Sequence, residues 1–152
     1  KINSTVEFSS DFIIAYPGED KNDFESTLNL IKKIKFINSF SFIFSPRPGT
    51  VASNLKLIER KVSLERLKLV QKGLFNNQLE MNKSLENKVI NILVENKTNK
   101  SIKFFGRSEY MTPVIFDGND EDVGKIIKVK ITNSNQNTLF GKRVEKLNLR
   151  VA

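Results

Sequence analysis

The hydrophobic pattern of this 152-residue chain changes its period near residue 86. Before that point, apolar residues occur in continuous runs or at helical spacing, whereas after it they alternate with polar residues. Continuous runs are typical of strands in parallel sheets, and alternation is typical of strands with one buried face. We therefore expect an α/β domain over residues 1–83 and a small all-β domain over residues 84–150.

A strand, a helix and a second strand are predicted at the start of the chain. Residues 10–16 (SDFIIAY) form an apolar run that fits a strand buried on both faces, and residues 40–44 fit a second buried strand. Between them, Phe24 and Ile31 belong to a helical stripe, with Asp20 as the expected N-cap. This pattern predicts a βαβ unit with parallel strands.

Two loops rich in Pro and Gly follow these strands, PGED after the first and SPRPGT after the second. The carboxyl ends of parallel strands meet at one edge of a sheet, where ligands of α/β folds bind, so the loops should be neighbours. Arg47 lies between two prolines in the second loop. Its guanidinium suits a carboxylate or a phosphate, and we expect it to have a polar role there. The plainer alternative is that both loops are only rigid turns.

A long helix should follow these loops. Residues 52–60 are weakly helical, and a stronger pattern begins at Ser63, a plausible N-cap. Leucine and valine residues then recur on one stripe to about residue 81, which is typical of a helix that covers a sheet.

The chain from about residue 86 onward has the pattern of a small antiparallel β-barrel. Barrels of this size often bind nucleic acid. Turn residues separate the five expected strands, which are residues 87–95, 102–107, 113–117, 125–132 and 139–144.

Basic and aromatic side chains on these strands favour an RNA partner. The chain has a net charge of +8, and residues 124–152 hold seven basic side chains, among them Lys146 and Arg150, against one acid. Phe104 and Phe105 are adjacent, so one ring of the pair must face outward, where it could stack on a base. A packed ring and a solvated lysine surface are the plainer alternatives. The candidate RNA-binding residues are Lys103, Phe105, Arg107, Lys128, Lys130, Lys142 and Arg143.

The chain contains neither cysteine nor histidine. Cysteine-ligated metals, thiolate chemistry and the commonest general base are therefore absent from these residues, so we assign no catalytic or metal-binding residue here. No apolar run approaches the length of a membrane span. We expect a cytoplasmic protein.

Several motifs in order resemble the carboxyl-terminal half of the MiaB-type tRNA methylthiotransferases. These motifs are SSDFIIAYPGED, FSFIFSPRPGT, GRSEY, VIFDG, GKIIKVKITNSNQNTLFGK and LRVA. The resemblance implies the last part of a radical S-adenosylmethionine (SAM) β/α barrel, TIM-like in fold, followed by an RNA-binding TRAM domain. It also implies transfer of a methylthio group to C2 of N6-dimethylallyladenosine, next to the anticodon of tRNA.

The same resemblance implies SAM and two 4Fe-4S clusters as cofactors, with the cluster cysteines outside this chain. It also implies that late barrel strands position SAM. The matching positions here are Ile13, Ala15, Phe42, Phe44, Ser45 and Arg47. Ala15 stands where the family usually has glycine, so a ligand close to the backbone at this position would meet an additional methyl group.

Three alternatives stay open at this point. A sister enzyme could act on threonylcarbamoyladenosine in tRNA or on an aspartate of a ribosomal protein, and a module that only binds RNA would need no chemistry. The chain starts at Lys1, and we expect it to be a fragment of a longer protein. We expect this fragment to be a monomer and to be inactive on its own.

Overall fold

The computed structural model describes residues 6–98 and 103–144. The chain divides into two compact units, Lys1–Gln78 and Leu79–Ala152. One helix, α2 (Arg60–Ser84), begins in the first unit and ends in the second. The boundary expected at residue 83 falls inside that helix. No helix in the described part of the chain is long and apolar enough to cross a membrane.

The first unit opens with the βαβ arrangement that the apolar runs predict. Its elements are β1 (Asp11–Ile14), α1 (Lys21–Ile34), β2 (Phe40–Ile43) and the 3-10 turn η1 (Val51–Asn54), followed by α2. The two strands pair in parallel, with Asp11 opposite Phe40 and Ile14 opposite Ile43. Their carboxyl ends therefore lie at the same edge.

The start of α1 follows the sequence prediction. Asp20 accepts a hydrogen bond from the Asp23 N–H at 2.9 Å, and the Asp23 side chain accepts one from the Asp20 N–H at 3.1 Å. This reciprocal capping satisfies two N–H groups that the helix itself leaves without partners. At the other end, Lys35 adopts a left-handed conformation and its N–H donates to Ile31 O at 3.0 Å.

The start of α2 differs from the prediction. Ser63 does not cap the helix: it is buried inside the first turns, and its hydroxyl donates to Glu59 O at 3.1 Å. A serine hydroxyl can bond to the carbonyl four residues earlier within a helix, so it is an ambiguous start signal. The weak pattern over residues 52–60 likewise forms part of η1 and a loop, and α2 begins only at its last residue, Arg60.

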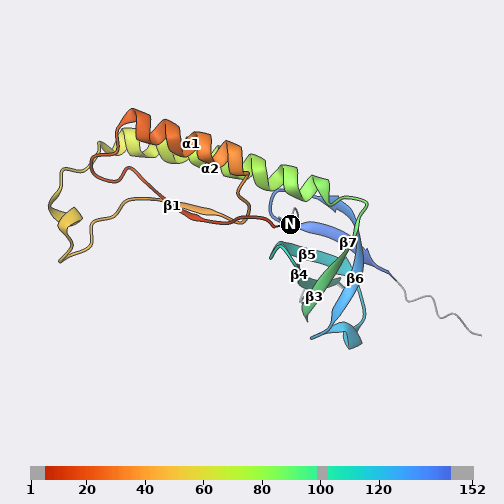
Figure 1. The fold of residues 1–152 in the computed structure, drawn as a ribbon. Coiled ribbons are helices and arrows are strands. Elements are labelled where there is room, and N and C mark those ends of the chain that lie inside the picture. Colours follow the sequence, from red (N-terminus) through yellow and green to blue (C-terminus); the bar gives the residue numbers. More distant parts are fainter. Residues whose placement is uncertain (1–5, 99–102, 145–152) are drawn as a thin grey trace, which may run out of the picture. The chain divides into compact units, whose positions relative to one another are not determined.

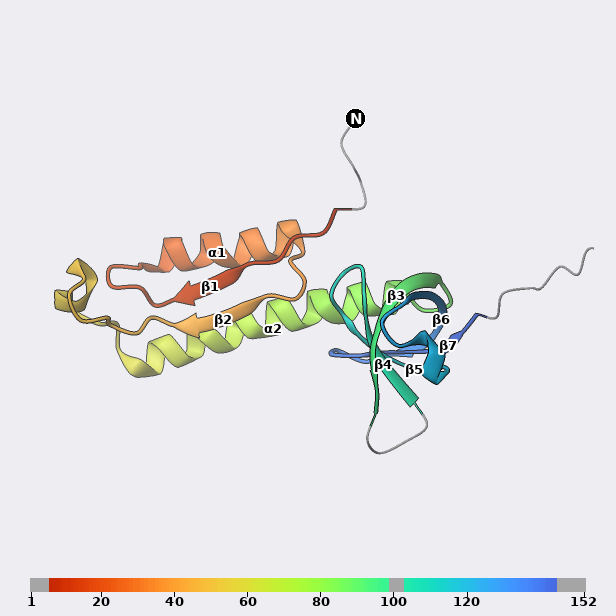
Figure 2. The ribbon, with the colours of Figure 1, turned by 90° about the horizontal axis from the view of Figure 1, so that it is seen from below.

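Helices α1 and α2 lie on one side of the β1–β2 pair (Figure 1), and Figure 2 shows the two strands side by side. The core between these layers consists of Phe12, Ile14, Ala15, Phe24, Ile31, Val70 and Leu74. The opposite face of the strands is open, with Ile13, Phe40 and Phe42 exposed by 61%, 63% and 55%. The expectation that these strands are buried on both faces is therefore wrong for this chain, because no second layer among the described residues covers them.

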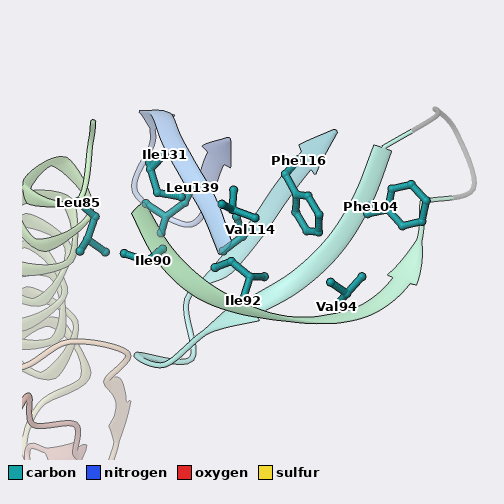
Figure 3. Packing of buried hydrophobic residues seen from close by; sticks show 10 residues of the cluster. Leu85, Ile90, Ile92, Val94, Phe104, Val114, Phe116, Ile131 and Leu139 are labelled. Atoms are coloured by element: carbon teal, nitrogen blue, oxygen red, sulfur yellow. The ribbon is translucent and has the colours of Figure 1, made fainter. Parts of the chain in front are cut away.

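The second unit is a closed five-stranded barrel with strand order β3-β4-β5-β7-β6. Its strands are β3 (Val89–Lys97), β4 (Lys103–Ser108), β5 (Pro113–Asp117), β6 (Ile126–Ser134) and β7 (Leu139–Arg143), and the 3-10 turn η2 (Asp120–Asp122) precedes β6. Alternate residues of each strand point inward. Figure 3 shows how Ile92, Phe104, Val114 and Phe116 fill the interior.

One strand pair corrects the prediction of an antiparallel barrel. β5 and β7 run parallel, while the other four pairs are antiparallel. Strand directions cannot alternate around a closed ring with an odd number of strands, so five strands require at least one parallel pair. This strand order is the one expected of a Greek-key barrel of the OB type.

The last turns of α2 belong to the barrel unit through Asn82. Its side chain is fully buried, and its amide donates to Asn135 O at 2.8 Å and to Gln136 O at 3.0 Å. Both acceptors lie in the turn between β6 and β7. A buried amide with these partners fixes that turn against the helix end.

Candidate cofactor edge and nucleic-acid interface

The two Pro-Gly loops form matching turns after β1 and β2. The Glu19 N–H donates to Tyr16 O at 2.9 Å, and the Thr50 N–H donates to Arg47 O at 3.2 Å. Gly18 and Gly49 occupy the third turn position with φ of +94° and +82°. Proline at the second position and a glycine of positive φ at the third are what a type II turn requires.

Direct contacts join the two strand ends that carry these turns. The Phe44 N–H donates to Ile14 O at 2.8 Å. The rings of Tyr16 and Phe44 pack edge to face with centroids 5.0 Å apart. The two turns therefore emerge at one edge, and we call them together the turn edge.

Glu19 connects the first turn to α2 through a hydrogen bond and an ion pair. Its carboxylate accepts the Ala15 N–H at 3.0 Å and forms an ion pair with Arg66. The Arg66 guanidinium also donates to Glu19 O at 2.9 Å and lies over the Phe24 ring. The side chains of Glu19 and Arg66 are only 12% and 14% exposed. Sequence reasoning missed this pair, because no local pattern connects residues 47 positions apart.

The candidate cofactor residues occupy different surroundings. Ile13 and Phe42 lie on the open face, and Ser45 and Arg47 are exposed at the turn edge. No hydrogen bond or ion pair of the Arg47 guanidinium occurs among the described residues. Phe44 is half-buried against Tyr16. These assignments stay predictions.

Ala15 has an unusual backbone conformation. Its φ is +60°, and its side chain is 3% exposed in the core under the helices, away from the open face. A residue with a Cβ is strained in this left-handed region, whereas glycine is not. Glycine is therefore suited to this position for backbone reasons, whatever lies nearby.

Three of the candidate RNA-binding cations are held by acids of the barrel. Lys103 Nζ lies 3.0 Å from Asp117 Oδ1, and Arg107 Nε lies 2.9 Å from Glu95 Oε1. Arg143 Nε lies 2.9 Å from Asp122 Oδ2, and the Asp122 side chain is only 6% exposed. The near-complete burial of its partner gives Arg143 a structural role, and its contact with RNA stays a prediction.

Three other candidate lysines differ from these cations because no acid in the described part of the chain holds them. Among the described residues, no hydrogen bond or ion pair involves the ammonium groups of Lys128, Lys130 or Lys142. Lys130 and Lys142 are direct cross-strand partners on β6 and β7, and Lys128 lies two residues from Lys130 on the same face. We call these three the lysine cluster. Like charges opposite one another repel, so this cluster favours an anionic partner. Lys146 and Arg150 lie outside the described residues.

A shallow cavity of about 330 Å³ adjoins the lysine cluster. Its lining consists of Asp117, Gly118, Asn119, Lys142 and Arg143. Phe105 points outward on β4, as one ring of the Phe pair had to, while Phe104 is 1% exposed in the core. No group of three potential metal ligands occurs in the described part of the chain.

This barrel belongs to a known class of domain. Residues 83–144 match the model of the TRAM domain family, which confirms the domain expected from the sequence.

The full chain is similar to one kind of enzyme. It is 62% identical over all 152 residues to the tRNA-2-methylthio-N(6)-dimethylallyladenosine synthase of Pelagibacter ubique, of which it covers 34%. Synthases of the same name from Ruthia magnifica and Wolbachia pipientis wMel are 44% and 40% identical over 93% of the chain, which covers 32% and 33% of them. The resemblance to the MiaB-type methylthiotransferases is confirmed. The chain spans about a third of the length of these relatives.

Proposed function

We propose that this chain is part of a tRNA methylthiotransferase that adds a methylthio group to C2 of N6-dimethylallyladenosine. The observation that carries the proposal is the 62% identity to a synthase of that name across every residue of the chain. In this proposal the first unit completes the SAM pocket and the barrel binds tRNA in the cytoplasm.

The open face of β1 and β2 suits the adenine of SAM. Ile13 and Phe42 are cross-strand partners there, so their side chains offer a continuous apolar surface. The turn edge adds the exposed guanidinium of Arg47, which fits the SAM carboxylate or an RNA phosphate. When bound, SAM supplies the radical chemistry, and these residues bind and orient it.

Iron-sulfur clusters have no ligands in this chain. Thiolates are the usual cluster ligands, and the sequence has no cysteine. Both 4Fe-4S clusters of the proposed enzyme would be held by the remainder of the full-length protein, so the fragment alone is expected to be inactive.

Nucleoside mass spectrometry tests the reaction. A strain that lacks the gene should lose 2-methylthio-N6-dimethylallyladenosine from its tRNA, and the full-length gene should restore it. Loss of the threonylcarbamoyladenosine derivative instead would assign the chain to the sister enzymes. Unchanged tRNA nucleosides would refute the proposal.

Arg47→Ala in the full-length enzyme tests the turn edge. The variant should lose most methylthiolation while its melting temperature stays the same, because the Arg47 guanidinium makes no hydrogen bond or ion pair with the described residues. Arg60→Ala, at an exposed arginine on α2, is the matched control and should keep full activity. Equal activity of the two variants would exclude a role for Arg47 in the pocket.

A further inference from the structure

An apolar row crosses three neighbouring strands on the outside of the barrel. Phe105 on β4 is the cross-strand partner of Ile115 on β5, and Ile115 is the partner of Phe140 on β7. All three side chains point away from the core, and each is of intermediate burial, neither fully buried nor fully exposed. We call them the outer row.

The barrel does not need the outer row for its own core. The inward positions beside it hold Phe104, Val114, Phe116 and Leu139, each at most 1% exposed. Single apolar residues on a surface need no explanation, but two aromatic rings and an isoleucine in one line form a continuous apolar strip.

Cations border this strip. The Arg107 guanidinium lies 5.6 Å from the centre of the Phe105 ring. Two residues further along β7 from Phe140 is Lys142, whose partner across β6 is Lys130. Two residues along a strand span about 7 Å, a distance that one nucleotide can bridge between its base and its phosphate.

We propose that the outer row binds the bases of an unpaired RNA segment, while Lys130 and Lys142 bind its phosphates. The proposal rests on the RNA-binding function proposed for the barrel and names the form of RNA that it takes. Aromatic side chains stack on bases only when the base faces are accessible, whereas bases in a duplex are covered by their neighbours. The flanking cations favour RNA over an apolar protein surface as the occupant.

Binding of fluorescently labelled RNA to the 152-residue chain tests this proposal. One probe is an unstructured single strand, and the other is a fully paired hairpin. Phe140→Leu keeps an apolar side chain but removes the ring, and Phe140→Tyr keeps the ring. Phe75→Leu, at an exposed aromatic on α2, is the matched control.

We expect Phe140→Leu to weaken binding of the single strand at least about 5-fold, with Phe140→Tyr and Phe75→Leu close to the parent chain. The salt dependence of binding should be unchanged in Phe140→Leu, and its slope should fall by about 0.7 in Lys142→Gln, where one phosphate contact is lost. Phe105→Leu provides a second test at the other end of the row if Phe140→Leu fails to fold.

Two results would overturn the proposal in different ways. If the parent chain binds the single strand but the leucine variants bind it equally well, or if the hairpin binds as tightly, the barrel binds RNA without the outer row. If the parent chain binds neither probe, the RNA-binding function of the barrel fails together with the outer row.

Discussion

At the scale of single residues, the backbone of Ala15 is the clearest case of strain. A left-handed conformation costs a residue with a Cβ about 1–2 kcal/mol relative to glycine. Burial of the methyl group in the core of the first unit offsets part of this cost, since one buried CH₂ contributes about 0.8 kcal/mol. The two effects nearly cancel.

Ala15→Gly should therefore change the free energy of unfolding little. Ala52→Gly removes another buried methyl group, at a residue of negative φ, and it should cost about 1–2 kcal/mol because no strain is relieved. Urea unfolding of both variants gives the comparison. An equal loss in the two would show that the conformation of Ala15 carries no strain.

Local patterns predicted some residue roles and not others. The Asp20 cap and the outward ring of Phe105 follow from neighbours in the sequence, so they could be predicted. The ion pair of Arg143 could not be predicted, because its partner Asp122 is 21 residues away and approaches only when β7 closes the barrel. A count of basic residues cannot separate a paired arginine from an unpaired lysine.

At the scale of elements, the ion pair of Glu19 and Arg66 holds the first turn against α2. Breaking a buried pair leaves one charge without a partner in a poorly solvated place, which costs about 3–5 kcal/mol. An exposed pair such as Lys21 and Glu25 contributes about 0.3–0.5 kcal/mol at most.

Glu19→Ala should accordingly destabilise the chain far more than Glu25→Ala. The first variant also removes the acceptor of the Ala15 N–H, so the turn edge should loosen. Thermal unfolding gives the stability, and hydrogen exchange of the Ala15 amide reports on the turn. Similar melting temperatures for the two variants would refute the structural role of Glu19.

Glycine in β7 is required by close packing between strands. A Cβ added to Gly141 would lie 2.7 Å from Lys130 O, whereas one added to Gly73 in α2 would meet only the Ile31 side chain, at 3.3 Å. Backbone atoms of a closed barrel cannot move aside as a side chain can.

Gly141→Ala is expected to destabilise the barrel by about 1–3 kcal/mol, as overpacking does. Gly73→Ala should stay within about 1 kcal/mol of the parent chain, because the higher helix propensity of alanine offsets the tight contact. Chemical denaturation measures both. If Gly141→Ala leaves the free energy of unfolding unchanged, β6 and β7 are less closely packed than the 2.7 Å approach to Lys130 O indicates.

The positions of the helices and strands were largely predictable from the sequence. The way in which the strands pair to close the barrel was not. Alternation located all the barrel strands to within two residues, since that pattern is local. The parallel pairing of β5 and β7 depends on which strands meet when the barrel closes. The open face of β1 and β2 depends on how many layers pack against the sheet, and the hydrophobic pattern of the strands does not give that number.

At the scale of the whole molecule, the chain has a net charge of +8, and the lysine cluster contributes to it without acidic partners among the described residues. Lys130 and Lys142 face each other across β6 and β7, and such a like-charge pair costs about 0.2–1 kcal/mol. A pair of lysines with this cost in stability is reasonable where the two ammonium groups bind an anion.

Lys142→Gln should therefore raise the melting temperature slightly in low salt and at the same time weaken RNA binding. High salt should abolish the stability gain, because it screens the repulsion. Lys61→Gln, at an exposed lysine on α2, should change neither property. A loss of stability together with a loss of RNA binding would instead identify Lys142 as a structural residue.

The buried amide of Asn82 determines where the barrel could be separated for study. The TRAM match begins at residue 83, and a recombinant barrel cut there would lack this amide. The carbonyl groups of Asn135 and Gln136 would then lose their donor, and the hairpin that presents β6 and β7 would be free to fray. An expression boundary at Leu79 keeps the anchor and is the better choice for crystallisation or NMR.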